Sequence, residues 1–330
     1  MQTNRSAPDQ RQSLEHFPIN TFASVMGFAG LSLGWQHIAS AHVIGANETA
    51  CTLRLFTSAL FLILLVTYFI KAIRYPKSIS QELQHPVKIS FFATIPISII
   101  LLSQLWLEPR PELARLLWFA GSITMLVATM ATFYSWMHQH HYKRPHLNPA
   151  WFIPVVGNIL IPIAGVPLGY PETSWFFFSI GLVFWMVLLV LITSRLFFEP
   201  PLPDRLLPTL FILLAPPAVG FIALTSLENQ QIGTLSQILF GISLFLGLIL
   251  ISSLHRFIRL PFFLSAWAYA FPTAALTLAC FRMVSINHNP GLAVLAVSLL
   301  AILSLLVLWL LIKSILMMAR GRLFVPEPPM

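Results

Sequence analysis

The segment Gly291–Ala319 reads GLAVLAVSLLAILSLLVLWLLIKSILMMA, and Lys313 is its one charged residue. A run of about 20 apolar residues is long enough to cross the hydrocarbon of a bilayer as a helix. The rest of the chain has the same character, because 57% of its 330 residues are hydrophobic and only 9% are charged. Soluble domains carry about 25% charged residues, so we expect membrane lipid to be the solvent of this protein.

Ten stretches of the sequence are long and apolar enough to be membrane spans. They are Ile19–Ile38, Ala46–Ile73, Val87–Leu107, Leu113–Met137, Trp151–Gly169, Ser174–Phe198, Leu207–Leu227, Ile232–Ile258, Pro261–Met283 and Gly291–Ala319. We therefore predict an all-α integral membrane protein with a single ten-helix transmembrane domain over residues 18–320, between an N-terminal tail (1–17) and a C-terminal tail (321–330). The polar N-terminal tail lacks the early apolar core of a signal peptide.

The positive charges fall unevenly on the two sides of these stretches. The side that holds both tails carries fifteen of the 19 Lys and Arg residues, and the other side carries only Arg54, Arg110, Arg115 and Arg282. Loops rich in Lys and Arg stay on the cytoplasmic side of a membrane. We therefore place both termini in the cytoplasm, which agrees with an even number of spans.

Prolines in the interior of a stretch occur only in the odd-numbered stretches, while the first stretch has glycines instead. Proline removes a backbone hydrogen bond and bends a helix, and lipid tolerates the break only where protein or water satisfies the freed carbonyl. We therefore expect five helical hairpins, with kinked odd-numbered helices inside and straight even-numbered helices outside. The alternative is that prolines are simply common in membrane helices. The candidate pore-lining or kink residues are Gly27, Pro96, Pro154, Asn158, Pro216 and Pro272.

Chemistry-bearing groups are scarce inside the stretches. All eleven Asp and Glu residues lie in links or near helix ends, and Cys51 and Cys280 offer no metal-ligand spacing. We therefore expect no enzyme, no cofactor, no metal site and no nucleic-acid partner. Ion-coupled carriers keep an ionisable group inside the membrane, so a neutral throat with a basic cytoplasmic mouth favours an anion channel.

Two basic features leave alternatives open. Arg54 lies well inside the second stretch, where it could attract anions, or could snorkel to the interface or pair with Glu48. The histidines of the link after the fourth stretch could bind a metal or sense pH, or could form a solvated, lipid-facing loop. They are His138, His140, His141 and His146.

Six short motifs then point to a known family. They are FPINTFASVMGFAGLSLGW (Phe17–Trp35), HPVKISFFATIPIS (His85–Ser98), FIPVVGN (Phe152–Asn158), FEP (Phe198–Pro200), LAPPAVG (Leu214–Gly220) and SAWAYAFP (Ser265–Pro272). In order and spacing they resemble the tellurite-resistance/dicarboxylate transporter family, which includes bacterial TehA proteins, plant slow anion channels and fungal malate permeases. One departure is Ala23, where bacterial members commonly have glycine, so close helix approach at that position is in question.

The resemblance implies a quasi-fivefold arrangement of the hairpins in which the kinked odd-numbered helices line a central pore. It further implies a homotrimer with one pore per subunit and a bacterial inner (plasma) membrane location. It also implies passage of small monovalent anions such as chloride and nitrate, with Phe271 as the ring that plugs the pore. The alternative for Phe271 is a packed core aromatic, since the chain has 27 Phe. The alternative function is a carrier or exporter of dicarboxylate, sulfite or tellurite-type oxyanions, because the shared fold does not choose between them.

Overall fold

A computed structural model describes residues 13–139 and 142–321, and this part of the chain is helical and contains no strand. The predicted tails and the histidines His140 and His141 therefore lie largely or wholly outside the described residues. The α-helices are α1 (Phe22–Ser40), α2 (Ala46–Arg74), α3 (Pro76–Gln84), α4 (Lys88–Phe91), α5 (Thr94–Leu105), α6 (Pro111–His138), α7 (Ile153–Gly165), α8 (Pro171–Phe198), α9 (Ala215–Leu227), α10 (Thr234–Ser252), α11 (Leu254–Ile258), α12 (Ala270–Asn287) and α13 (Pro290–Ala319). The 3-10 helices are η1 (Leu14–His16), η2 (Ile19–Thr21), η3 (Arg144–His146), η4 (Pro149–Phe152), η5 (Leu207–Leu214) and η6 (Leu264–Tyr269).

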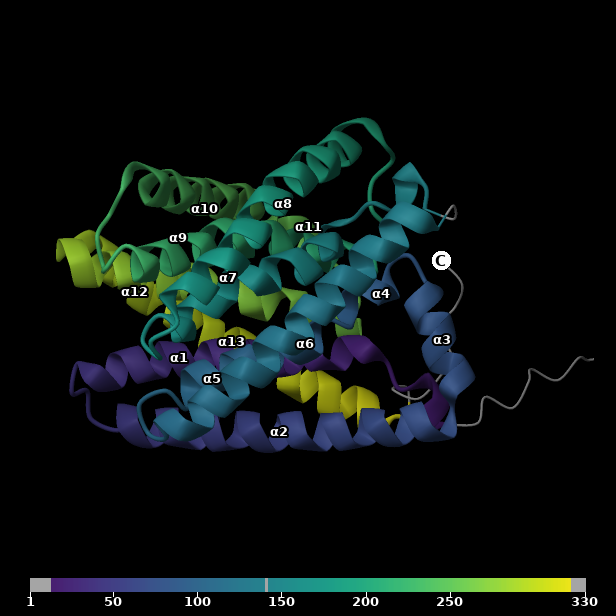
Figure 1. The fold of residues 1–330 in the computed structure, drawn as a ribbon, viewed down its shortest axis with the longest axis horizontal. Coiled ribbons are helices and arrows are strands. Elements are labelled where there is room, and N and C mark those ends of the chain that lie inside the picture. Colours follow the sequence, from purple (N-terminus) through teal and green to yellow (C-terminus); the bar gives the residue numbers. More distant parts are fainter. Residues whose placement is uncertain (1–12, 140–141, 322–330) are drawn as a thin grey trace, which may run out of the picture.

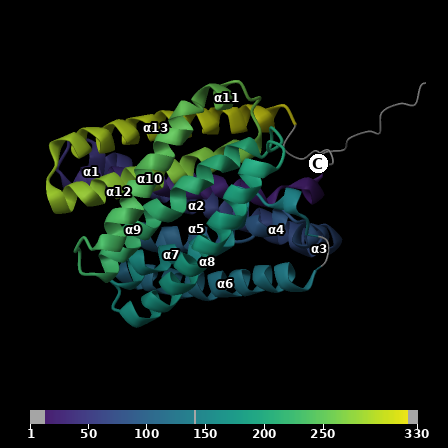
Figure 2. The same cartoon turned by 90° about the horizontal axis from the view of Figure 1, so that it is seen from above.

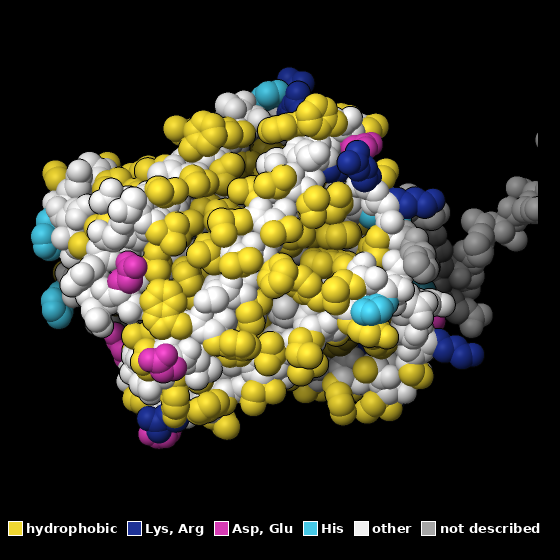
Figure 3. Space-filling view, turned by 45° about the horizontal axis from the view of Figure 1, so that its top comes forward, with side chains coloured by type: hydrophobic (Ala, Val, Ile, Leu, Met, Phe, Trp, Pro, Cys, Tyr) yellow, Lys and Arg dark blue, Asp and Glu magenta, His cyan; other side chains and the backbone are white. Residues whose placement is uncertain are grey.

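Eight helical segments of the described chain are long and apolar enough to cross a membrane. The other two predicted stretches appear as α1, which has 19 residues, and as the shorter apolar helix Pro149–Gly165. Side chains of the apolar type cover the broad face of the molecule, and charged side chains gather at its edges (Figure 3). The expectation of an all-α, multi-pass membrane protein is therefore confirmed.

The membrane-crossing segments fall into a buried and an exposed class. In the segments that contain α4–α5, η5–α9 and η6–α12, 78% of the apolar window is buried inside the protein. In α2, α6, α8, α10 and α13 the buried share is only 17–33%. The exposed class lies at the periphery: α2 and α8 run along opposite edges of the bundle in Figure 1, and α13 and α6 along opposite edges in Figure 2.

Contacts between the inner helices close into a ring. Helix α1 packs against α5, α5 against α7, α7 against α9, α9 against α12, and α12 returns to α1. Each ring helix also packs against the peripheral helix that follows it in the chain, which pairs α1 with α2, α5 with α6, α7 with α8, α9 with α10 and α12 with α13. A ring of five helices encloses an axis, and residues that face this axis are candidates for a functional site.

The prolines of the ring lie where they cost little backbone hydrogen bonding. Pro96, Pro154, Pro216 and Pro272 each occupy the first turn of an α-helix that follows a short helical or 3-10 segment. The first N–H groups of an α-helix have no partner within the helix, so a proline there removes no intrahelical bond. These prolines therefore mark junctions between two helical pieces, and only Pro162 lies inside an α-helix of the ring in the described chain.

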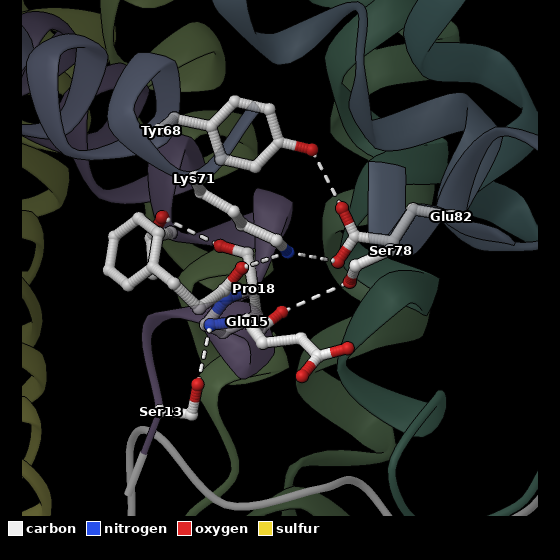
Figure 4. A network of polar contacts seen from close by, with 9 residues as sticks. Ser13, Glu15, Pro18, Tyr68, Lys71, Ser78 and Glu82 are labelled. Carbon is white, nitrogen blue, oxygen red and sulfur yellow. Dashed lines mark hydrogen bonds and ion pairs between the residues drawn. The ribbon is translucent and has the colours of Figure 1, made fainter. Parts of the chain in front are cut away.

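A buried polar network ties the beginning of the described chain to α2 and α3 (Figure 4). Lys71 Nζ lies 2.8 Å from Glu82 Oε1 and donates to the Phe17 carbonyl at 2.7 Å, while the Tyr68 hydroxyl donates to Glu82 Oε2 at 2.7 Å. The Lys71 side chain is fully buried, and the Glu82 side chain is 9% exposed. A buried ion pair is tolerated when further hydrogen bonds satisfy both charges, and here Phe17 and Tyr68 supply those bonds. We call this end of the molecule the α3 end.

Candidate functional site

Two cavities lie on the axis of the helix ring. The larger has a volume of about 370 Å³ and opens at the end opposite α3, where all five ring helices contribute residues to its wall. The smaller has a volume of about 40 Å³, lies nearer the α3 end, and is also lined by all five ring segments. Its wall is apolar except for Thr94, whose hydroxyl donates to the Phe91 carbonyl at 2.6 Å.

Phe271 and Leu160 border both cavities. Phe271 is the second residue of α12, and only 7% of it is exposed. Leu160 comes from α7 and is 2% exposed. These two apolar side chains therefore stand between a wide, open cavity and a narrow, apolar one.

Most of the other glycine and proline candidates of the sequence analysis are buried without lining either cavity. Pro272 lines the smaller cavity, whereas Gly27, Pro96, Pro154 and Pro216 line neither cavity, and all of them are buried. The prolines thus lie at junctions within the ring helices. In most cases the side chain next to the proline faces the axis, and the proline itself does not.

Asn158 faces α6 through hydrogen bonds, and it lines neither cavity. Its Nδ2 donates to Thr129 Oγ1 at 2.9 Å and to the Pro154 carbonyl at 3.1 Å, and Thr129 Oγ1 itself donates to the Pro154 carbonyl at 2.8 Å. Asn158 is the polar residue that sequence reasoning singled out in the ring, and in the structure it binds the backbone beside a proline junction.

Gly27 allows α1 and α12 to approach each other closely. A Cβ atom at this position would lie 2.7 Å from the Cβ atom of Ala270 and 3.2 Å from the ring of Trp267. Ala270 directly precedes Phe271, so this contact sets the position of the first turn of α12. Close approach occurs at Gly27, while Ala23 lines the smaller cavity.

The larger cavity contains polar groups that the sequence analysis did not select. Arg282 and His37 line it, and so does Glu108 from the link between α5 and α6. The Arg282 guanidinium donates a hydrogen bond to Gln230 Oε1. One feature of the sequence could have indicated Arg282 as a site residue. It is one of only four basic residues on the less basic side, and it lies near the end of a proline-containing stretch.

The sequence of this chain matches that of a known family of membrane proteins. The sequence model of the SLAC1 family, described as voltage-dependent anion channel, matches residues 16–315. The chain belongs to the SLAC1 family. Because this family consists of channels and transporters, it is a family of anion-translocating membrane proteins and not of enzymes.

Relatives within the SLAC1 family come from archaea, bacteria and plants. An uncharacterized transporter of Methanocaldococcus jannaschii is 28% identical over 283 residues, which cover 78% of this chain and 82% of the relative. The tellurite resistance protein TehA homolog of Haemophilus influenzae is 24% identical over 283 residues, which cover 85% and 86% of the two chains. The S-type anion channel SLAH3 of Arabidopsis thaliana is 28% identical over 314 residues, which cover 92% of this chain but 48% of the plant protein. This chain therefore spans less than half of the plant channel.

The remaining basic candidates of this SLAC1-family protein lie away from the axis. Arg54 lines neither cavity: its guanidinium lies 5.0 Å from the centroid of the Trp106 ring, and Nη2 lies 3.5 Å from Cys51 Sγ. His138 stacks on Tyr134 with ring centroids 4.4 Å apart. Among the described residues no group of three or more His, Cys, Asp or Glu side chains is arranged to hold a metal ion.

Proposed function

We propose that this protein is a gated anion channel whose axial pathway is closed by the Phe271 ring. The position of Phe271 carries the proposal, because this side chain borders both axial cavities and separates them together with Leu160. An ion that enters the narrow apolar cavity loses hydration that no charged side chain of its described wall replaces, which costs free energy. Rotation of the Phe271 side chain about χ1 removes the obstruction and lets water follow the ion.

The direction of the ring helices supports anions over cations. The first turns of α5, α7, α9 and α12 border the smaller cavity, through Thr94, Ile153, Ala215 and Phe271. The N-terminal end of an α-helix carries a partial positive charge of about half a unit. Several such ends around one narrow, uncharged passage lower the cost of entry for an anion and raise it for a cation.

The full arrangement that we propose has ten transmembrane helices in five hairpins with quasi-fivefold symmetry. The ring helices line the pore, and the α3 end with both termini faces the cytoplasm, as the Lys and Arg count indicates. By resemblance to the family, we propose a bacterial inner membrane location, a homotrimer with one pore per subunit, and chloride and nitrate as permeant ions. Tellurite resistance remains part of the alternative, in which the protein exports oxyanions or dicarboxylates as a carrier.

Current recording on purified protein in planar bilayers tests the proposal. Phe271→Ala should raise the chloride current at least about tenfold, which corresponds to a barrier lowered by roughly 1.4 kcal/mol. The matched control is Phe221→Ala, because Phe221 is also a buried ring-helix phenylalanine but packs on Phe240 of α10 and lines neither cavity.

The reversal potential distinguishes the two functions. For a channel it follows the chloride gradient and does not change when a proton gradient is added, whereas a proton-coupled carrier follows both gradients. A Phe271→Ala protein that inserts normally but conducts no better than the wild type and the Phe221→Ala control would refute the gate.

A further inference from the structure

The larger cavity lies where the ring helices end. Its wall includes Ser40, the last residue of α1, and Leu105, the last residue of α5, together with Ile163 near the end of α7. The C-terminal end of an α-helix carries a partial negative charge of about half a unit, and Glu108 adds a carboxylate to the same wall. An anion that approaches from this end therefore meets a wall that would repel it unless a positive group compensates.

Arg282 is the positive group in the described part of this wall. No carboxylate contacts its guanidinium: the ion pairs in the described residues are Lys71–Glu82 and Arg115–Glu112, and the partner of Arg282 is the neutral Gln230 amide. The charge of Arg282 is therefore not neutralised by a neighbour. Arg282 lies on α12, three turns beyond Phe271 on the same helix.

His37 lies beside Arg282 with its hydrogen-bonding groups free. Its ring stacks on Phe281, the residue before Arg282, with ring centroids 4.4 Å apart. Within the described structure neither ring nitrogen of His37 has a hydrogen-bond partner. Each neutral imidazole keeps one N–H donor, so His37 adds a donor to the charge of Arg282.

Two glutamine amides lower the negative potential of the same wall. Gln36 Nε2 donates to the Leu105 carbonyl at 3.2 Å, and Gln104 Nε2 donates to the Leu160 carbonyl at 3.3 Å. Both glutamines line the larger cavity. Each bond occupies a carbonyl oxygen of a neighbouring ring helix, and each amide nitrogen keeps a second N–H.

We propose that Arg282 and His37 form a recruitment site for a small inorganic anion in the larger cavity, before the anion reaches Phe271. This inference rests on the proposed channel function and deepens it by assigning the site that concentrates the permeant ion. The cavity of about 370 Å³ holds the ion with roughly ten water molecules. Because the ion stays hydrated, the site binds weakly and releases quickly, as throughput requires.

The test uses the Phe271→Ala protein, in which the gate no longer limits the current. Arg282→Gln in this background should raise the chloride concentration for half-maximal current from the Arg282 side by about fivefold, the factor for one unit charge at contact distance in water. Current at saturating chloride should change little. Arg282→Lys should retain most of the affinity, since it keeps the charge, and it also controls for a folding defect of Arg282→Gln.

Arg115→Gln is the matched control, because Arg115 lies on the same side of the membrane in our topology but pairs with Glu112 on the surface of α6 and lines neither cavity. It removes the same charge and should leave the chloride dependence unchanged. The proposal is overturned if Arg282→Gln conducts with the chloride dependence of its parent, or if Arg115→Gln shifts it equally.

A second measurement separates the recruitment site from the gate. Anomalous diffraction from crystals soaked in bromide should place an ion against the Arg282 guanidinium in the wild type and not in Arg282→Gln. If Phe271→Ala carries no current but bromide binds at Arg282, the channel function fails and the anion site stands. If Phe271→Ala conducts and no bromide density appears near Arg282, the channel function stands and the recruitment site is refuted.

Discussion

Gly27→Ala should both destabilise the protein and open its axial pathway. The new Cβ atom would lie 2.7 Å from Ala270 Cβ and 3.2 Å from the Trp267 ring. Carbon atoms in contact prefer a separation of about 3.5–4.0 Å, so α1 and the start of α12 must separate by about 1 Å. Overpacking of this kind costs about 1–3 kcal/mol.

The separation matters for conduction because α1 and α12 are neighbours in a closed ring. Moving them apart widens the ring at the turn that carries Phe271, so chloride leak through the otherwise intact gate should increase. The assay combines bilayer current with thermal unfolding in detergent followed by size-exclusion chromatography. Ala270→Gly in the same chain removes the closer of the two contacts and should restore part of the stability and part of the closure.

Gly241→Ala is the control for this experiment, because a Cβ atom on Gly241 of α10 would meet nothing within 4 Å. It should leave the current unchanged and stabilise α10 by about 0.5–1 kcal/mol. A Gly27→Ala protein with wild-type stability and wild-type closure would refute the reasoning, and so would a double variant no better than Gly27→Ala alone.

Three further outcomes are expected from the contacts described above. Leu160→Ala should raise the chloride current with the gate ring intact, but by less than removal of that ring, because Leu160 supplies only one side of the barrier; bilayer recording checks this. Lys71→Met should lower the free energy of unfolding by about 3–5 kcal/mol, because it leaves the Glu82 carboxylate buried without its cation. The double variant Lys71→Met with Glu82→Gln should recover part of this loss, and chemical denaturation of the variants measures both effects. Thr129→Val should lower the free energy of unfolding by about 0.5–1.5 kcal/mol, because it removes a buried hydrogen bond while Asn158 Nδ2 still donates to the Pro154 carbonyl. Unchanged chloride selectivity would agree with a role outside the pathway.

Much of the architecture could be predicted, because composition indicates a membrane protein and the positions of the prolines indicate which helices are buried. An apolar chain with 9% charged residues cannot be a soluble domain, and the helices and the family confirm a membrane protein. The proline-containing stretches became the buried segments, although their prolines lie at junctions between helical pieces and not in broken helix interiors. Phe271 was singled out among 27 phenylalanines only through the family motif that ends in Pro272.

The remaining features depend on distances that no sequence pattern carries. The expectation of prolines breaking helix interiors was wrong in detail for four residues, which lie in the first turns of α-helices after a short preceding segment: Pro96, Pro154, Pro216 and Pro272. The position of Arg54 deep in an apolar stretch makes it a candidate anion site, yet in the structure its guanidinium lies over the Trp106 ring. Arg282 lies nearer a helix end and was not selected as a site residue from the sequence, although the fold brings it to the wall of the larger cavity.

The polar network at the α3 end also has a consequence for how the chain is made. Its described groups all lie between Ser13 and Glu82, so every partner of Lys71 in that network is synthesised before the residues that follow Glu82. Synthesis proceeds at roughly 5–20 residues per second, which leaves at least about ten seconds before translation ends. Lys71, the one fully buried lysine, can therefore form its ion pair and hydrogen bonds during biosynthesis. The later helices then pack against an α3 end that has already folded.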